Sequence, residues 1–204
     1  MTMSMFNMIA ITNRGLCPGD FLTQIRRIAK ANPYRIILRE KDLSELNYLT
    51  LAGEVLSICA EEGAVCTLHT SFFAAKTLQC PRIHLPLHQL EQNRHQLEGF
   101  VEIGASVHSV AEAKLAQRAG ATYVTAGHVF TTDCKAGVPP RGLDFLQAVC
   151  EAVEIPVYGI GGIGPQNIKQ IAESGAAGAC IMSGFMKETA VSQYLAYCKR
   201  NLKA

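Results

Sequence analysis

The feature that most constrains the fold of this chain is a regular alternation between short apolar runs and longer segments with helical periodicity. Eight runs of four to six residues carry many β-branched side chains, as buried strands do. These runs are residues 8–12, 34–39, 64–69, 82–85, 101–106, 123–126, 157–160 and 178–182. Between them, apolar residues recur every three or four positions, which is typical of amphipathic helices. The clearest helical segments are 21–31, 44–62, 110–119, 143–153 and 165–174.

This alternation favours a parallel sheet, because parallel strands need crossover connections and helices supply them. Such a sheet is either closed as a barrel or open and doubly wound, and eight strand–helix repeats favour closure. We therefore predict a single (β/α)8 TIM barrel of the α/β class that spans residues 1–204 as one domain. The crossover at 86–99 is the weakest of the predicted helices, since Pro86 interrupts its start.

Composition narrows the classes of partner. The formal net charge is only +2 and the basic residues are scattered, so nothing indicates a surface for nucleic acid or membranes. No apolar run approaches the roughly 18 residues of a membrane span, and residues 1–11 lack the pattern of a signal peptide. The eight cysteines form no CxxC pair, which is typical of reduced core residues. We expect a cytoplasmic protein with a small-molecule partner, and the oligomeric state stays open, a homodimer included.

Glycine-rich segments follow the last two predicted strands. In β/α barrels the loops after strands seven and eight often bind phosphate, and helix N-termini there direct free N–H groups at the anion. Gly161 and Gly162 stand in the first of these segments, and Ser183 and Gly184 in the second. Glycines also serve tight turns that hold no ligand. Because two such segments coincide at these places, we predict that these four residues bind phosphate.

A long polar loop follows the sixth strand, and His128 stands where the strand ends. An imidazole with an ordinary pKa of about 6.5 can take and return a proton near neutral pH, which suits a catalytic role. The alternative is a histidine satisfied by a backbone carbonyl. Cys134 lies beside Lys135, which would favour its thiolate, but no base stands near it in the sequence to make it a nucleophile.

Polar residues also end the second and fifth strands. Arg39 and Lys41 offer two cations to a carboxylate or a phosphate, unless they belong to a solvated ion-pair cluster. Ser106 and His108 either line the pocket or form the cap of the following helix.

Three further histidines, His69, His84 and His88, raise the question of a metal. His84 and His88 are four residues apart, but Pro86 between them breaks the helix that such a pair of ligands would need. We therefore predict no metal site and no cofactor.

Together these residues resemble the thiamine phosphate synthase superfamily of small phosphate-binding barrels. The resemblance covers the second to the eighth strand and rests on an Arg-x-Lys, a Ser-Val-His and a Gly-Gly-Ile motif, which begin at Arg39, Ser106 and Gly161. Within the superfamily, segment 127–135 resembles the thiazole tautomerase branch, in which a histidine occupies the position of His128.

The resemblance implies an isomerase of thiamine biosynthesis that acts on a phosphorylated thiazole carboxylate. His128 would move a proton from a ring carbon to an exocyclic carbon and so make the ring aromatic. Arg39 and Lys41 would hold the carboxylate. The remaining wall of the substrate site would come from five residues, namely Ser106, His108, Thr131, Cys134 and Lys135.

Thiamine phosphate synthase is the nearest alternative enzyme, and a non-catalytic or regulatory barrel that binds thiazole phosphate is an alternative of another class. The resemblance implies that synthases hold magnesium with carboxylates after strands three and four. Here those places are residues 69–73 and 85–89, and neither contains Asp or Glu. The sequence therefore favours the tautomerase, which needs no metal.

Overall fold

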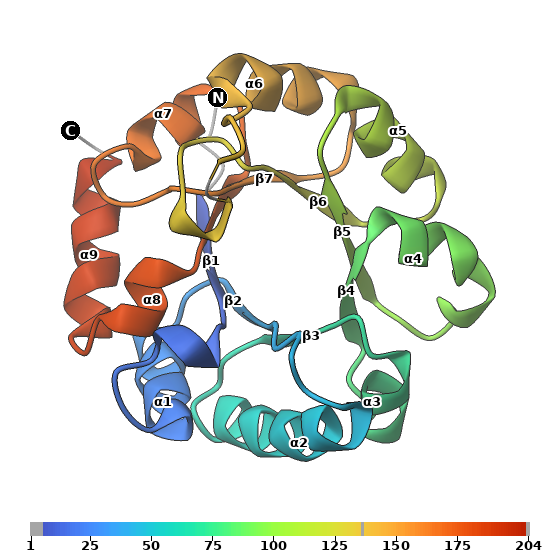
Figure 1. Ribbon diagram of the computed structural model, residues 1–204, viewed down its shortest axis with the longest axis vertical. Coiled ribbons are helices and arrows are strands. Elements are labelled where there is room, and N and C mark those ends of the chain that lie inside the picture. The colour runs from blue at the N-terminus through green and yellow to red at the C-terminus, as the bar shows by residue number, and fades with distance from the viewer. Residues whose placement is uncertain (1–5, 136, 203–204) are drawn as a thin grey trace.

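Eight parallel strands form a closed barrel in which each strand pairs with its neighbours in chain order, and β8 pairs with β1 (Figure 1). The computed structural model describes residues 6–135 and 137–202, so both ends of the predicted 1–204 domain lie outside the described residues. The strands are β1 (Asn7–Ile11), β2 (Arg35–Leu38), β3 (Cys66–His69), β4 (Arg82–Pro86), β5 (Glu102–Val107), β6 (Tyr123–Gly127), β7 (Val157–Ile160) and β8 (Gly178–Ile181). The predicted (β/α)8 barrel is thus confirmed.

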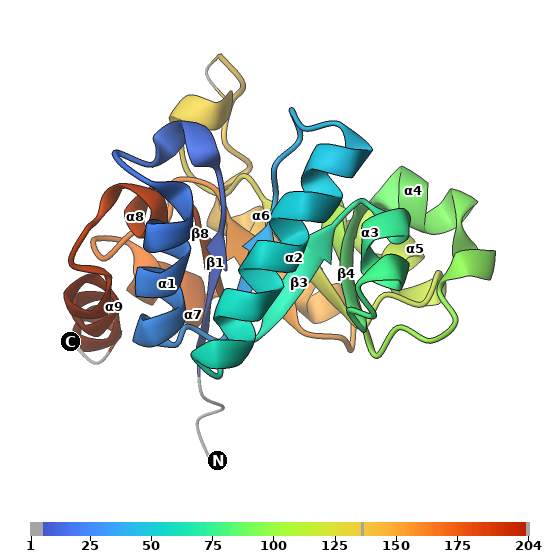
Figure 2. The ribbon, with the colours of Figure 1, turned by 90° about the horizontal axis from the view of Figure 1, so that it is seen from below.

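Helices surround the barrel and connect the strands (Figures 1 and 2). They are α1 (Phe21–Ala31), α2 (Glu45–Glu61), α3 (Phe72–Thr77), α4 (Leu87–Gln92), α5 (Val110–Arg118), α6 (Gly142–Ala152), α7 (Ile168–Glu173), α8 (Ser183–Lys187) and α9 (Val191–Asn201). Three 3₁₀ turns occur as well, η1 (Arg14–Leu16), η2 (Arg94–Gln96) and η3 (Asp133–Lys135). Within the described residues, no helix is both long and apolar enough to cross a membrane.

The observed elements follow local sequence signals closely. Every strand begins and ends within two residues of its predicted bounds. Ser44 and Ser109 start α2 and α5 because their hydroxyls accept hydrogen bonds from backbone N–H groups that the first turn leaves free. In the fourth crossover, Pro86 shapes the start of the helix without abolishing it, since α4 begins at the next residue.

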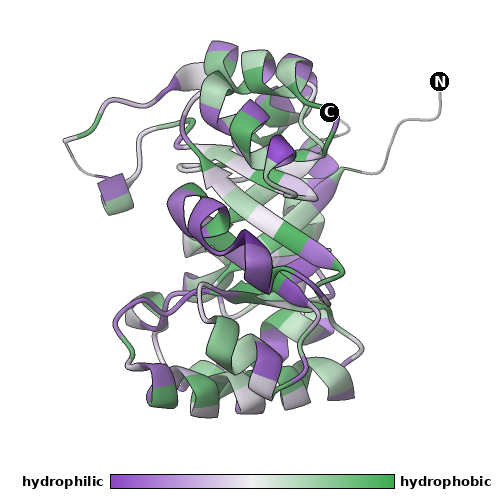
Figure 3. Cartoon of the chain, turned by 90° about the vertical axis from the view of Figure 1, so that its right-hand side faces the viewer, coloured by the Kyte–Doolittle hydropathy of each residue, from purple (hydrophilic) through white to green (hydrophobic). Residues whose placement is uncertain are grey.

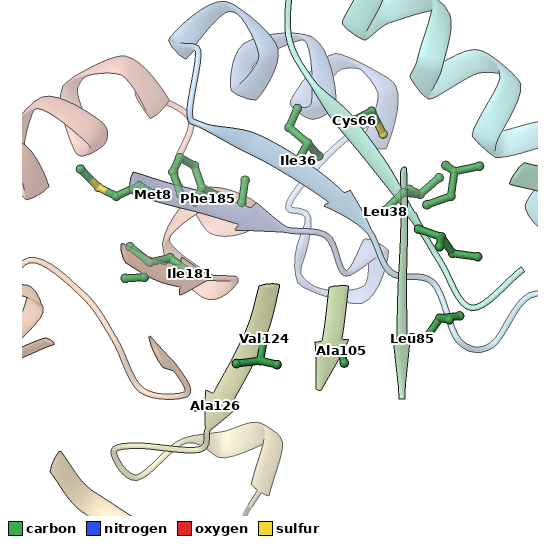
Figure 4. Packing of buried hydrophobic residues seen from close by; sticks show 14 of the residues in the cluster. Met8, Ile36, Leu38, Cys66, Leu85, Ala105, Val124, Ala126, Ile181 and Phe185 are labelled. Atoms are coloured by element: carbon green, nitrogen blue, oxygen red, sulfur yellow. The ribbon is translucent and has the colours of Figure 1, made fainter. Parts of the chain in front are cut away.

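The hydrophobic core has two layers because successive side chains of a strand point to opposite sides of the sheet. One layer lies inside the barrel and includes Ile9, Ile37 and Tyr158. The other lies between the strands and the helices, where Figure 4 shows Ile36 and Leu38 of β2 among its members. Figure 3 shows helices that carry both hydrophobic and hydrophilic residues, as expected for helices with one face against the sheet.

A charged group fills the amino-terminal end of the barrel. The Arg35 side chain is only 3% exposed, and its Nη2 donates a hydrogen bond to Glu102 Oε1 at 2.9 Å. Its guanidinium lies 4.7 Å from the ring centroids of both Tyr34 and Tyr123, at the distance of a cation–π contact. This end of the barrel is therefore packed, and ligands are expected at the carboxyl-terminal end.

Leu38→Ala tests the packing between the sheet and the helices. Leu38 is fully buried, so the cavity left by truncation should lower the free energy of unfolding by about 2–5 kcal/mol. Leu46→Ala is the matched control, because Leu46 is 68% exposed and its loss should change stability by no more than about 0.5 kcal/mol. Urea unfolding measures both variants, and equal effects would contradict this description of the core.

Candidate functional site

A small cavity of about 40 Å³ opens at the carboxyl-terminal end of the barrel. It lies on the barrel axis, since seven strands contribute to its wall. The lining residues are Ile11, Ile37, Arg39, His69, His84, Ser106, Thr125 and Ile160. Two of the predicted substrate-binding residues, Arg39 and Ser106, are therefore brought together at this mouth.

Positive charge gathers on one side of the mouth. Lys41 follows β2, and partial burial lowers the pKa of its ammonium group, with the nearby positive charges of Arg39 and Lys135 acting in the same direction. Lys135 belongs to η3, in the loop that projects beyond the barrel on this side (Figure 2). The structure thus brings together three predicted residues from two loops, and like charges so close favour an anionic ligand.

A buried carboxylate holds the segment that carries these cations. Glu40 is 6% exposed and accepts hydrogen bonds from Thr12 Oγ1 at 2.7 Å and from Arg14 Nε at 3.2 Å. The Thr12 hydroxyl oxygen in turn accepts from the backbone N–H of Arg39 at 2.9 Å. These contacts form a Glu40 clamp that the sequence did not predict, because the Arg-x-Lys motif does not indicate whether Glu40 points inward.

The predicted phosphate-binding residues lie in the loops after β7 and β8. Gly161 and Gly162 have positive φ values of 101° and 65°, and a Cβ on either would collide with the segment after β6, at His128 and at the Thr131 carbonyl. These glycines therefore let two loops pack closely. Ser183 begins α8, whose first turn has no side-chain cap.

A buried glutamine of α1 fixes α8 in place. Gln24 is fully buried, and its Nε2 donates hydrogen bonds to the carbonyls of Phe185 and Glu188, both at 2.7 Å. Since Ser183 and Gly184 belong to the same short helix, this contact also fixes two of the predicted phosphate-binding residues.

His128 and His108 both use backbone acceptors. His128 is only 7% exposed, and its Nε2 lies 3.1 Å from the Val138 carbonyl oxygen. His108 Nδ1 lies 2.8 Å from the Gly127 carbonyl oxygen. The His108 contact links the segment after β5 to the end of β6, and the His128 contact lies within the segment after β6. The structure thus gives each imidazole a partner in the protein.

The deepest polar group of the cavity was not among the predicted site residues. His84 lies between Ser106 and Tyr123, with its Nε2 2.9 Å from Ser106 Oγ and its Nδ1 3.1 Å from the Tyr123 hydroxyl. The His69 ring stacks on His84 with 5.7 Å between centroids. The inward-facing parity of β3 and β4 could have placed both imidazoles in the mouth.

Burial keeps these two imidazoles neutral. It lowers the pKa of His84 from 6.5 to about 3, and the charges of Arg35 and Arg39 act in the same direction. Burial likewise lowers the pKa of His69 from 6.5 to about 2, with His84 and two cations adding to the effect. At neutral pH both rings are therefore hydrogen-bonding groups without charge.

The residues present do not fit a carboxylate-held magnesium ion. Residues 69–73 and 85–89, where β3 and β4 end, contain no Asp or Glu, and no cluster of three or more His, Cys, Asp or Glu residues suited to a metal occurs within residues 6–135 and 137–202. Cys134 is exposed and reduced. A larger hollow of about 230 Å³ lies on the outer wall between α1 and α9 and contains none of the predicted site residues.

The fold and the mouth together define a class: a (β/α)8 barrel with a small polar cavity and a cationic rim, suited to a small anionic ligand. The chain belongs to the TMP-TENI family, described as thiamine monophosphate synthase, whose family model matches residues 8–185.

Relatives agree with this assignment, and a solved structure shares the fold. A putative thiamine-phosphate synthase 2 of Aquifex aeolicus is 32% identical over 187 residues, which are 91% of this chain and all of the relative. A thiamine-phosphate synthase of Syntrophomonas wolfei is 30% identical and covers 91% of both chains. The thiamine phosphate pyrophosphorylase structure from Pyrococcus furiosus superposes with a TM-score of 0.85 at 24% identity, covering 98% of this chain and 96% of that one.

These findings contradict our prediction of a thiazole tautomerase, and with it the assignment as an isomerase. Relatives at about 30% identity over most of the chain carry the name thiamine-phosphate synthase. The prediction rested on the short segment around His128. In the structure the Nε2 of this residue faces a backbone carbonyl, so a histidine at this position also has a structural explanation.

The neutral histidines predict a pH-dependent stability. Unfolded histidines take up protons near pH 6.5, whereas His84 and His69 stay neutral until about pH 3 and pH 2. The unfolded state therefore binds more protons below pH 6.5, and stability falls as the pH is lowered. Each buried histidine should contribute about 1.4 kcal/mol per pH unit to this slope.

Urea unfolding of the wild type and of His69→Gln between about pH 7 and pH 4.5 measures this contribution. The free energy of unfolding should depend less steeply on pH in the variant, because one buried histidine is missing. His95→Gln is the control, since His95 is exposed. Identical slopes for the wild type and His69→Gln would show that His69 takes up its proton in the folded state.

Proposed function

We propose that this protein is a thiamine-phosphate synthase, which transfers a pyrimidine group from diphosphate to a thiazole phosphate and releases the diphosphate. The observation that carries this proposal is the similarity to proteins of that name along about nine-tenths of the chain. The polar mouth of the barrel is the corresponding substrate site.

The cations at the mouth support a diphosphate leaving group. Breaking the bond between carbon and the diphosphate oxygen leaves negative charge on the diphosphate. Arg39, Lys41 and Lys135 lie close enough together to stabilise that charge, Arg39 through a bidentate hydrogen bond and the lysines as point charges. The Glu40 clamp keeps the backbone of Arg39 in place while the charge develops.

The thiazole phosphate is assigned to the loops after β7 and β8, on the other side of β1 from the cations that follow β2. In this proposal Gly161, Gly162, Ser183 and Gly184 bind its phosphate. A phosphate bound there would place the thiazole ring at the outer end of the mouth and leave Ser106 and the cavity to the pyrimidine group. The segment after β6, with His128, Thr131 and Cys134, would close the remaining side.

No step of the proposed reaction is assigned to magnesium. Residues 69–73 and 85–89 supply no carboxylate for it, so the neutralisation of the leaving group is assigned to the cationic side chains at the mouth. This difference from the magnesium-binding pattern also favours a second candidate function, a non-catalytic barrel that binds thiazole phosphate.

The test is to mix the two phosphorylated precursors with the protein and to follow thiamine phosphate, with and without magnesium. We expect product in both cases. Lys41→Gln should lower kcat/KM about 10- to 100-fold, because it removes one charged hydrogen bond to the leaving group. Lys76→Gln, an exposed lysine of α3, is the matched control and should leave the rate unchanged.

Absence of product under all conditions would contradict the synthase proposal. If the thiazole phosphate alone then binds, as measured by calorimetry, the non-catalytic barrel replaces it. If neither precursor binds, the mouth serves another ligand.

A further inference from the structure

A chain of hydrogen bonds runs from the interior of the barrel to the mouth. It begins at the Tyr123 hydroxyl on β6, passes through the His84 imidazole on β4 and ends at Ser106 Oγ on β5, with separations of 3.1 and 2.9 Å. Ser106 and His84 line the cavity, but His84, like Tyr123, is only 3% exposed. Two buried groups thus act on one hydroxyl that a ligand can reach.

The sequence makes room for this chain of contacts at one glycine. Gly104 lies on β5 between the two partners, opposite His84 on one side and Tyr123 on the other. A Cβ at Gly104 would collide with His84 Nδ1 and with the Tyr123 hydroxyl. The two side chains therefore meet across β5 only because this position has no side chain.

The direction of the first hydrogen bond follows from the proton of Tyr123. Among the described residues, His84 Nδ1 is the one acceptor that lies within hydrogen-bond distance of this hydroxyl. The Arg35 guanidinium lies over the Tyr123 ring, but a guanidinium only donates. Burial raises the pKa of Tyr123, so the phenol keeps its proton. A buried O–H without an acceptor is costly, and Tyr123 therefore donates to His84 Nδ1.

The second hydrogen bond then has a fixed direction too. A neutral imidazole carries one proton, and burial lowers the pKa of His84 to about 3. Because Nδ1 accepts from Tyr123, the proton lies on Nε2, which donates to Ser106 Oγ. Thr125 Oγ1 lies at longer distances, 3.4 Å from His84 Nε2 and 3.5 Å from Ser106 Oγ. The Ser106 oxygen thus accepts its short hydrogen bond from His84.

We propose that Tyr123 and His84 are positioning residues that make Ser106 a hydrogen-bond donor toward the cavity. The serine proton then points to the ligand, so this place in the mouth recognises an acceptor atom, such as an unprotonated ring nitrogen or an anionic oxygen, and disfavours an N–H group. The ligand part of the inference rests on the proposed use of the mouth as the substrate site. The direction of the two hydrogen bonds does not depend on that proposed use.

The direction is tested first, by ¹⁵N NMR of protein labelled at histidine. In a neutral imidazole the two ring nitrogens have well-separated ¹⁵N shifts, which tell the protonated from the unprotonated one. We expect the Nε2–H tautomer for His84 near neutral pH in the wild type. The signal is assigned by its absence from His84→Gln, with His69→Gln as the control for the neighbouring ring. An Nδ1–H tautomer would reverse both hydrogen bonds and overturn the inference.

The effect on binding is tested by a double-mutant cycle. Calorimetry measures the Kd of the pyrimidine diphosphate precursor without the second substrate, so no turnover is required. Ser106→Ala should raise this Kd about 3- to 10-fold, since it removes one hydrogen bond. Tyr123→Phe should raise it in the wild-type background but leave it unchanged in the Ser106→Ala background, because Tyr123 acts through Ser106.

The controls separate a positioning role from a structural one. Tyr158→Phe alters another tyrosine of the barrel interior, whose ring lies 5.6 Å from that of Tyr123, and should change neither the Kd nor the His84 tautomer. Ser106→Thr keeps the hydroxyl and should restore most of the affinity lost in Ser106→Ala. Equal effects of Tyr123→Phe in both backgrounds would overturn the positioning role. If the precursor does not bind at all, the proposed function fails, while the NMR result still decides the direction.

Discussion

The structure depends on one geometric constraint, which is that a closed eight-stranded barrel admits only alternate residues of each strand to its interior. The side chains that point inward share a narrow volume, so each must pack or form hydrogen bonds with its neighbours. The interior therefore passes from a charged layer around Arg35, through apolar residues such as Ile9, to a polar mouth around His84. The mouth lies where the loops begin, and its cavity is lined by residues on the strands or next to them.

The fold could be predicted from the sequence because a strand signal occurs at each of the eight repeats and clear helical segments lie between most of them. Apolar runs predicted the strands, and the predicted helical segments 44–62 and 110–119 correspond to helices capped by Ser44 and Ser109. The site could be predicted only where a residue follows a strand, as Arg39 and Lys41 do. The contacts of Glu40, Gln24 and His84 depend on which way a side chain points and on partners far along the chain. Sequence spacing does not contain that information.

The wrong prediction of a thiazole tautomerase also arose because the sequence does not show which partner a side chain has. The segment around His128 was weighed for its catalytic potential, although an imidazole at a strand end can equally donate to a nearby carbonyl, as Nε2 does to Val138. Similarity over most of the chain favours a transferase. The missing carboxylates after β3 and β4 then describe how this member of the family differs from the magnesium-binding pattern. They do not identify a different reaction by themselves.

The salt bridge between Arg35 and Glu102 has a consequence for the order in which ligands bind and leave. Because this salt bridge fills the amino-terminal end, a ligand that binds deepest in the cavity has to enter from the carboxyl-terminal end before anything above it. Departure then follows the reverse order. For the proposed reaction of two substrates, this architecture favours an ordered kinetic scheme without a moving segment.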